Sequence, residues 1–97
     1  MMSIRKWWQR RRLLARLNLV RKQWSVLSAE QTRTMELLND GCRELIHAKT
    51  STKILATELI AAREKVHDLT LHLNELGDRL DSNKRQEKSI ERELELL

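Results

Sequence analysis

The sequence predicts an all-α, elongated coiled coil, and three observations support this prediction. Apolar residues recur at alternating intervals of three and four, which places them on one face of a helix. The 97 residues include only two Gly and no Pro, the residues that most often form turns, so few turns are expected. The only aromatic residues are three Trp, all within the first 24 positions. A chain of this length forms one domain at most.

Residues 1–29, called the basic arm below, form the first predicted element. They contain eight basic residues and no acidic one, a net charge of +8. The rest of the chain has 11 basic and 14 acidic residues, a net charge of −3, which gives +5 in total. Ser3 can cap a helix that starts directly after it. The asymmetry predicts an anionic partner for the arm, with these binding residues: Arg5, Lys6, Trp7, Trp8, Arg10, Arg11, Arg12, Arg16, Arg21 and Lys22.

Three classes of anionic partner fit the basic arm. Arg makes bidentate contacts with phosphate or carboxylate, and Trp beside Arg can stack on unpaired bases. Nucleic acid within a larger assembly is therefore the leading hypothesis. An adaptor or inhibitor that inserts its Arg/Trp helix into an acidic groove of a protein complex is the first alternative. A peripheral tether on an anionic membrane surface is the second. A solvated, charged helix end without a ligand is the structural alternative.

Residues 30–53 form the second element, a connecting helix or hinge with a weak apolar pattern. Asn39-Asp40-Gly41 favours a turn, and Ser28 with Gln31 resembles a capping box. We therefore expect either one long helix or two helices with a break near residues 28–41. A hairpin is a third architecture. It is less favoured, because the heptad frame of the C-terminal segment continues unshifted back to Leu13, as a single rod would require.

Residues 54–97 form the third element, a heptad segment. Its apolar stripe, called the seam below, occupies the a and d positions and must be covered by another helix. A homo-oligomer, with a dimer favoured, or a helix of a partner protein would cover it. In a parallel dimer Glu44 would meet Lys49, whereas Arg16 would face Arg21, so charges do not fix the orientation. The predicted seam residues are Leu55, Leu59, Ala62, Val66, Leu69, Leu73, Leu76, Leu80, Ile90 and Leu94.

Polar residues interrupt the seam at two neighbouring core positions. Asn83 falls at d and Glu87 at the next a position. Polar groups at such positions weaken packing but can specify the register of the helices.

No pattern in the chain predicts catalysis, a cofactor, a metal or a small-molecule substrate. Glu64 and His67 have the Glu-x-x-His spacing of di-iron bundles, but they fall on the outer face. Cys42 beside the seam lacks the partners of a nucleophile. No glycine-rich phosphate loop and no zinc-ligand set occurs. We therefore expect a binding protein that is not an enzyme.

Localisation follows from composition alone. A single Cys suggests a reducing compartment, and we expect a cytoplasmic protein. No apolar run approaches the roughly 20 residues of a spanning helix, and no apolar core of a secretion signal follows Met1. The arm is rich in Arg and free of acids, as mitochondrial leaders are, but such a leader is not expected.

Overall fold

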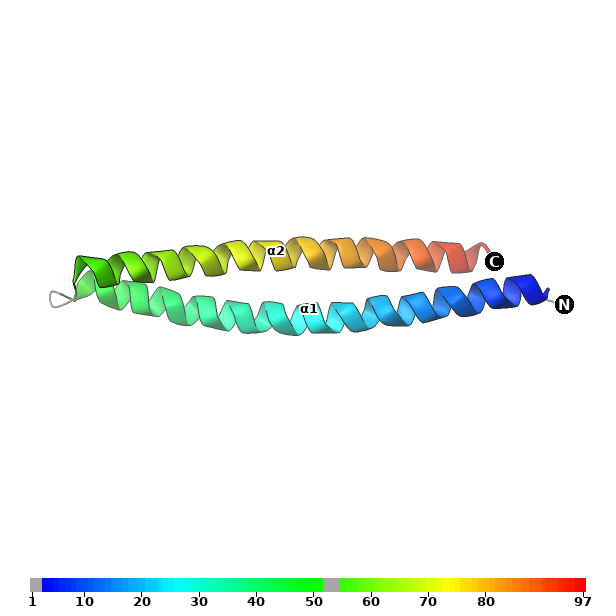
Figure 1. The fold of residues 1–97 in the computed structure, drawn as a ribbon, viewed down its shortest axis with the longest axis horizontal. Helices are drawn as coiled ribbons and strands as arrows, with labels where there is room; N and C mark the ends of the chain where they lie inside the picture. The colour runs from blue at the N-terminus through cyan, green and yellow to red at the C-terminus, as the bar shows by residue number, and fades with distance from the viewer. Residues whose placement is uncertain (1–2, 52–54) are drawn as a thin grey trace. The chain divides into compact units, whose positions relative to one another are not determined.

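The computed structural model describes residues 3–51 and 55–97, which form two α-helices and no strand. Helix α1 spans Ile4–Thr50 and helix α2 spans Ala56–Glu95 (Figure 1). The predicted all-α class is confirmed. The boundary predicted between residues 53 and 54 lies outside the described residues.

Helix α1 begins at the predicted cap. The backbone N–H of Lys6 donates a hydrogen bond to Ser3 Oγ at 3.2 Å, which satisfies one of the amides without an intrahelical partner. At the other end, Thr50 Oγ1 lies 3.1 Å from the carbonyl oxygens of both Ile46 and His47. The sequence there reads Thr50-Ser51-Thr52, a run whose hydroxyls compete with helical hydrogen bonding. Such hydroxyl-bearing residues favour the end of a helix, and α1 ends at Thr50.

The break expected near residues 28–41 does not occur, because α1 is helical throughout that range. Gly41 is buried, and a Cβ built on it would lie 3.4 Å from Val66 Cγ2 and 3.7 Å from Leu69 Cδ1. Tertiary packing at this small residue outweighs the low helix propensity of glycine. Nearby, Thr34 is buried and satisfies its hydroxyl locally by donating to the Glu30 carbonyl at 2.8 Å.

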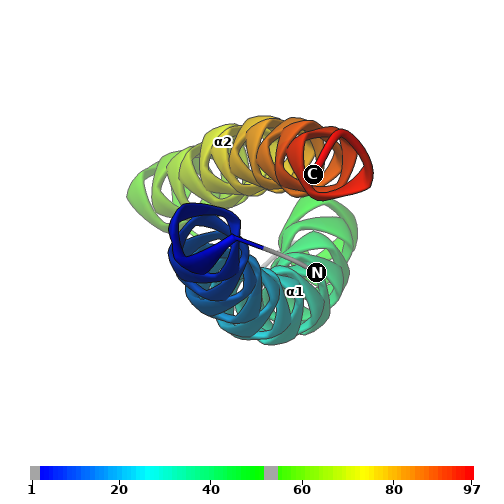
Figure 2. The same cartoon turned by 90° about the vertical axis from the view of Figure 1, so that its right-hand side faces the viewer.

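The chain divides into two compact units, each built from one segment of α1 and one of α2. Unit 1 comprises residues 1–28 and 78–97, and unit 2 comprises residues 29–77. In unit 1 the blue end of α1 lies beside the orange-to-red end of α2 (Figures 1 and 2). In unit 2 the two segments are joined by the short connection after Thr50. The unit boundary after residue 28 lies one residue from the predicted division between 1–29 and 30–53, and the boundary after residue 77 falls within the predicted segment 54–97.

Within each unit the two helical segments run antiparallel. In unit 1, Arg21 pairs with Glu91 at 3.6 Å, and both are e positions. In unit 2, Glu44 pairs with Lys65 at 3.3 Å, and both are g positions. In antiparallel coiled coils e pairs with e and g pairs with g, whereas in parallel coiled coils g pairs with e. The single rod is therefore wrong, and each unit is an antiparallel pair of helical segments, the pairing expected of the hairpin that the sequence favoured least.

The seam predicted from the heptad frame coincides with the buried face of both helices. Every buried residue in the described chain occupies an a or d position. In unit 1 the core cluster contains Leu13, Leu17, Val20 and Ile90, with Leu94 and Leu97 packed against it. Of the predicted seam residues, Leu76 and Ile90 are buried, and Leu55, which precedes α2, is exposed. The others are half-buried: Leu59, Ala62, Val66, Leu69, Leu73, Leu80 and Leu94.

The two glycines give a matched test of this packing. Both have negative φ within helices, so alanine is compatible with their backbone. A Cβ at Gly77 meets no described atom within 4 Å outside its own stretch of helix, and one at Gly41 makes ordinary contacts. We expect Gly77→Ala and Gly41→Ala each to raise the free energy of unfolding by about 1 kcal/mol in urea titrations followed by circular dichroism. If Gly77→Ala were stabilising and Gly41→Ala destabilising, α1 and α2 would lie closer together at Gly41 than the structure shows.

Candidate anion-binding helix

The cations of the basic arm lie on the first part of α1, and all of them are exposed. Residues 3–12 are exposed without exception. Arg16 is exposed between the buried Leu13 and Leu17, and Arg21 and Lys22 are exposed directly after the buried Val20. The a and d frame continues upstream of Leu13 with Arg10 and Lys6. The apolar seam therefore begins at Leu13, and upstream of it the same stripe of the helix is cationic.

One cation of the arm is neutralised by α2. Arg21 Nε lies 3.9 Å from Glu87 and its guanidinium lies 3.6 Å from Glu91. Glu87 is also approached by Lys84 Nζ at 3.6 Å, so this half-buried carboxylate has two basic neighbours. Within residues 3–51 and 55–97, no other cation of the arm forms an ion pair. Seven of the eight predicted cations are thus available to a ligand.

The net charge of unit 1 follows from the same distribution. Its two segments carry 13 basic and six acidic residues, a net charge of +7. Unit 2 carries six basic and eight acidic residues, a net charge of −2, which completes the total of +5. The positive potential is therefore concentrated on the unit that contains the arm, although α2 contributes acidic residues to it.

Two of the three tryptophans form an exposed cluster near the start of α1. The rings of Trp7 and Trp8 meet edge to face, with centroids 5.1 Å apart and an interplanar angle of 79°. The Arg11 guanidinium lies 5.3 Å from the Trp7 ring centroid, a cation–π distance. Trp7, Arg10, Arg11 and Leu14 line an open cavity of about 420 Å³. The arm thus combines aromatic surface and guanidinium groups within three helical turns.

Trp24 occupies a different environment. It stands at an a position of the seam, is 36% exposed, and has Lys84 Nζ 4.9 Å from its ring centroid. Its ring therefore contributes to the contact between the two segments of unit 1. The heptad frame already separates it from Trp7 and Trp8, because Trp24 falls at an a position and the other two do not.

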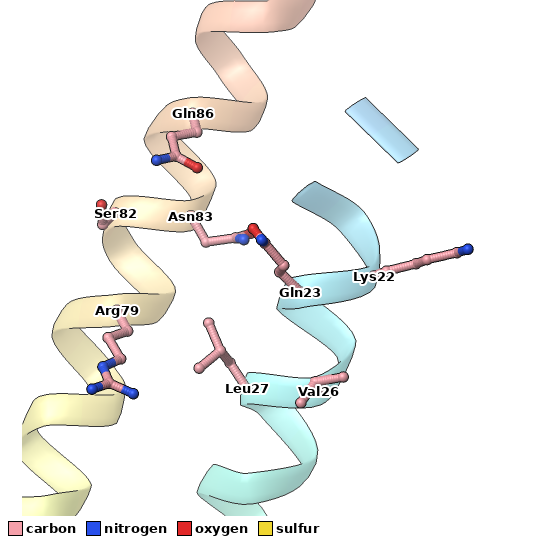
Figure 3. Close-up of a pocket in the computed structure, with 8 residues that line it drawn as sticks. All are labelled: Lys22, Gln23, Val26, Leu27, Arg79, Ser82, Asn83 and Gln86. Atoms are coloured by element: carbon pink, nitrogen blue, oxygen red, sulfur yellow. The ribbon is translucent and has the colours of Figure 1, made fainter. Parts of the chain in front are cut away.

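A groove of about 490 Å³ lies between the segments of unit 1 (Figure 3). At its centre, the amides of Asn83 and Gln23 point toward one another. Asn83 is 4% exposed, and its Nδ2 donates to the Val20 carbonyl at 3.0 Å. Asn83 is therefore buried in the core, as its d position predicts. Its neighbours across the groove could not be predicted from the sequence, because they belong to the distant segment of α1. The groove is lined by Lys22, Gln23, Val26, Leu27, Arg79, Ser82, Asn83 and Gln86.

The residues weighed for metal or nucleophilic chemistry lie apart from the basic arm. Glu64 and His67 are exposed on α2, and Cys42 is a half-buried free thiol on α1. His72 Nε2 lies 3.4 Å from a Glu30 oxygen. In the part of the chain that the structure describes, no group of three His, Cys, Asp or Glu side chains is placed to hold a metal ion.

No family model, curated protein or solved structure matches this chain. Among the described residues, neither helix has a stretch long and apolar enough to cross a membrane.

Proposed function

We propose that this chain is a non-enzymatic interaction protein whose basic arm binds the phosphate backbone of nucleic acid within a larger assembly. The observation that supports the proposal is the exposed cations of the acid-free first part of α1, where Arg21 alone of the arm's cations is paired within the described residues. Seven further cations offer phosphate contacts. Neutralising phosphates releases counterions, and this release supplies most of the affinity of non-specific binding.

The proposal also uses the antiparallel pairing. The seam residues Leu13, Leu17 and Val20 are covered by α2, so the arm is held as a helix before any ligand binds. A preformed helix loses less conformational entropy on binding than an unfolded basic tail would. Unit 1 thus presents its guanidinium groups along a helix that is already formed.

Salt-dependent titration tests this function. We expect Arg10→Gln/Arg11→Gln/Arg12→Gln to weaken binding to labelled DNA and to flatten the slope of log affinity against log salt. Successive residues are about 100° apart around a helix, so one or two of the three reach a phosphate at once. The slope should therefore fall by roughly 1–2. Fluorescence anisotropy over a salt series measures both quantities.

A matched control removes the same charge from elsewhere on α1. Arg33, Arg43 and Lys49 are all exposed in unit 2. The variant Arg33→Gln/Arg43→Gln/Lys49→Gln should keep the slope of the unmodified protein. Equal losses in the two triple variants would show that net charge, and not the arm, drives binding. Absence of binding, or binding that ignores salt, would remove the nucleic-acid function.

A homo-oligomer or a partner helix, which the seam predicts, remains a proposal, but the surface that it would use changes. Most of the seam is buried or half-buried within each unit, so we propose that an oligomer uses exposed apolar side chains outside it. In unit 2 these include Met35, Ile46, Ile60 and Leu71, each at least half exposed. Sedimentation equilibrium of the full chain measures the association state directly.

Acidic protein and membrane partners are distinguished by their own readouts. If the partner is an acidic groove of a protein, binding should be stoichiometric and should partly resist salt. Trp7→Ala should then weaken affinity more than removal of a single charge does. A membrane surface predicts a blue shift of tryptophan emission with anionic vesicles only. Retrieval of partners from the native source, with and without residues 1–29, compares all three classes.

A further inference from the structure

We propose that Trp7 and Trp8 form a stacking platform for unpaired bases, so that the basic arm binds single-stranded nucleic acid in preference to duplex. This inference rests on the proposed function and specifies its substrate class. Both side chains lie upstream of Leu13, the first buried seam residue, and are 46% and 58% exposed. Neither ring is therefore committed to the core of unit 1.

The geometry of the pair leaves ring faces available. In an edge-to-face contact, one ring presents its edge to one face of the other, so a single face is used. The Arg11 guanidinium covers one face of Trp7. Two of the four ring faces are not used by these contacts, and the exposure of both side chains keeps them accessible to a planar ligand.

The surroundings of the platform select a charged planar ligand. Arg10, Arg11 and Leu14 line the cavity beside Trp7, so an apolar side chain and two guanidinium groups adjoin the ring. A nucleotide offers a base to the ring and a phosphate to the guanidinium groups. In duplex DNA the base faces are already stacked on their neighbours. Only an unpaired strand presents both groups without first breaking that stacking.

The test compares strands that differ in their accessible bases. Binding of the full chain is measured by anisotropy with a labelled single strand, a duplex of the same length, and a single strand of the same length with abasic sites. Stacking is worth about 5- to 150-fold in affinity per base, equivalent to about 1–3 kcal/mol. We expect the intact single strand to bind more tightly than the abasic strand by a factor in this range.

Matched variants assign the effect to the platform. Trp7→Ala/Trp8→Ala should lower affinity for the intact single strand to that for the abasic strand, and should leave duplex affinity unchanged. Trp7→Phe/Trp8→Phe keeps two aromatic faces and should retain most of the preference. Leu19→Ala/Val26→Ala removes exposed apolar area from the same arm, where the two side chains are 57% and 67% exposed, and should change neither affinity. Circular dichroism checks that each variant keeps its helix.

The outcomes separate the stacking proposal from the proposed function. Equal affinity for intact and abasic strands, with a steep salt slope, would overturn stacking and leave phosphate binding standing. Equal losses on single strand and duplex in the Trp→Ala variant would also overturn it. Absence of binding to every strand would overturn both. If the Trp→Ala variant lost affinity for anionic vesicles alone, the platform would belong to a membrane surface and the stacking proposal would fail.

Discussion

Leu76→Ala is expected to lower the free energy of unfolding by about 3 kcal/mol, within the 2–5 kcal/mol range for deleting a buried leucine side chain. Leu76 is the one fully buried large side chain among the described residues, with no exposed surface. The truncation removes its hydrophobic contribution and leaves a cavity at a d position of unit 2. Since small domains are stable by only about 5–15 kcal/mol, this loss is a large share of the total. Urea titration at two protein concentrations measures it.

Leu71 supplies the matched control for this substitution. It lies on the same helix and in the same unit, but its side chain is 55% exposed. Leu71→Ala should change stability by less than about 0.5 kcal/mol, as surface substitutions do. If the two variants were equally destabilised, Leu71 would be buried in an association between chains. An unfolding midpoint that rises with protein concentration would lead to the same conclusion.

Asn83→Leu is expected to raise the free energy of unfolding by about 1–3 kcal/mol. Asn83 Nδ2 is bonded to the Val20 carbonyl, but its Oδ1 is buried and has no hydrogen-bond partner among the described residues. An unsatisfied buried acceptor costs stability, and the Val20 carbonyl lies within the regular hydrogen bonding of α1. The neighbouring groove of about 490 Å³ gives a larger apolar side chain space to settle (Figure 3). Thermal and urea unfolding measure the gain.

The same substitution should reduce structural specificity. A polar residue at a core position favours the register in which its hydrogen bond forms, and leucine removes that preference. We expect Asn83→Leu to self-associate more strongly in sedimentation experiments. Asn74→Leu, at an exposed position of α2, controls for the better helix propensity of leucine and should gain only a few tenths of a kcal/mol. A loss of stability in Asn83→Leu would show that the bond to Val20 outweighs the unpaired oxygen.

The helical period was the most informative part of the sequence. It placed Leu13, Leu17 and Val20 in one frame with Leu76 and Ile90, and all five are buried. Periodicity identifies which face of a helix is covered, because that depends only on spacing along one element. It does not identify what covers the face. Whether the seam meets another chain or folds back on itself depends on where the helix is interrupted.

The predicted position of the helix break, near residues 28–41, is wrong because local turn signals do not include tertiary packing. Asn39-Asp40-Gly41 is turn-prone in isolation, yet Gly41 is buried beside Val66 and Leu69, in a segment more than 20 residues away. The end of α1 at Thr50 has no Gly or Pro beside it, so composition does not mark it. In a parallel dimer Arg21 would face Arg16, a repulsive pair. In the antiparallel arrangement of unit 1 it pairs with Glu91 instead.

The candidate binding surface was predictable in composition but not in arrangement. An acid-free run of 29 residues is visible in the sequence, and so is the position of each tryptophan. Spacing separates Trp24, at an a position, from Trp7 and Trp8, but how far α2 extends along α1 is not predicted by spacing alone. The pairing of Arg21 with Glu87 and Glu91 depends on the same long-range contact.

The antiparallel contacts differ greatly in the length of chain that they enclose. Lys65 and Glu44 are 21 residues apart in sequence, whereas Asn83 and Val20 are 63 residues apart. Closing a loop three times as long costs about 1 kcal/mol more in chain entropy, so contacts near the connection form first and then shorten the remaining closure. We therefore expect pairing to form first within unit 2, whose contacts enclose the shorter loops, and last within unit 1. Openings confined to unit 1 would then uncover Leu13, Leu17 and Val20 while the pairing within unit 2 persists.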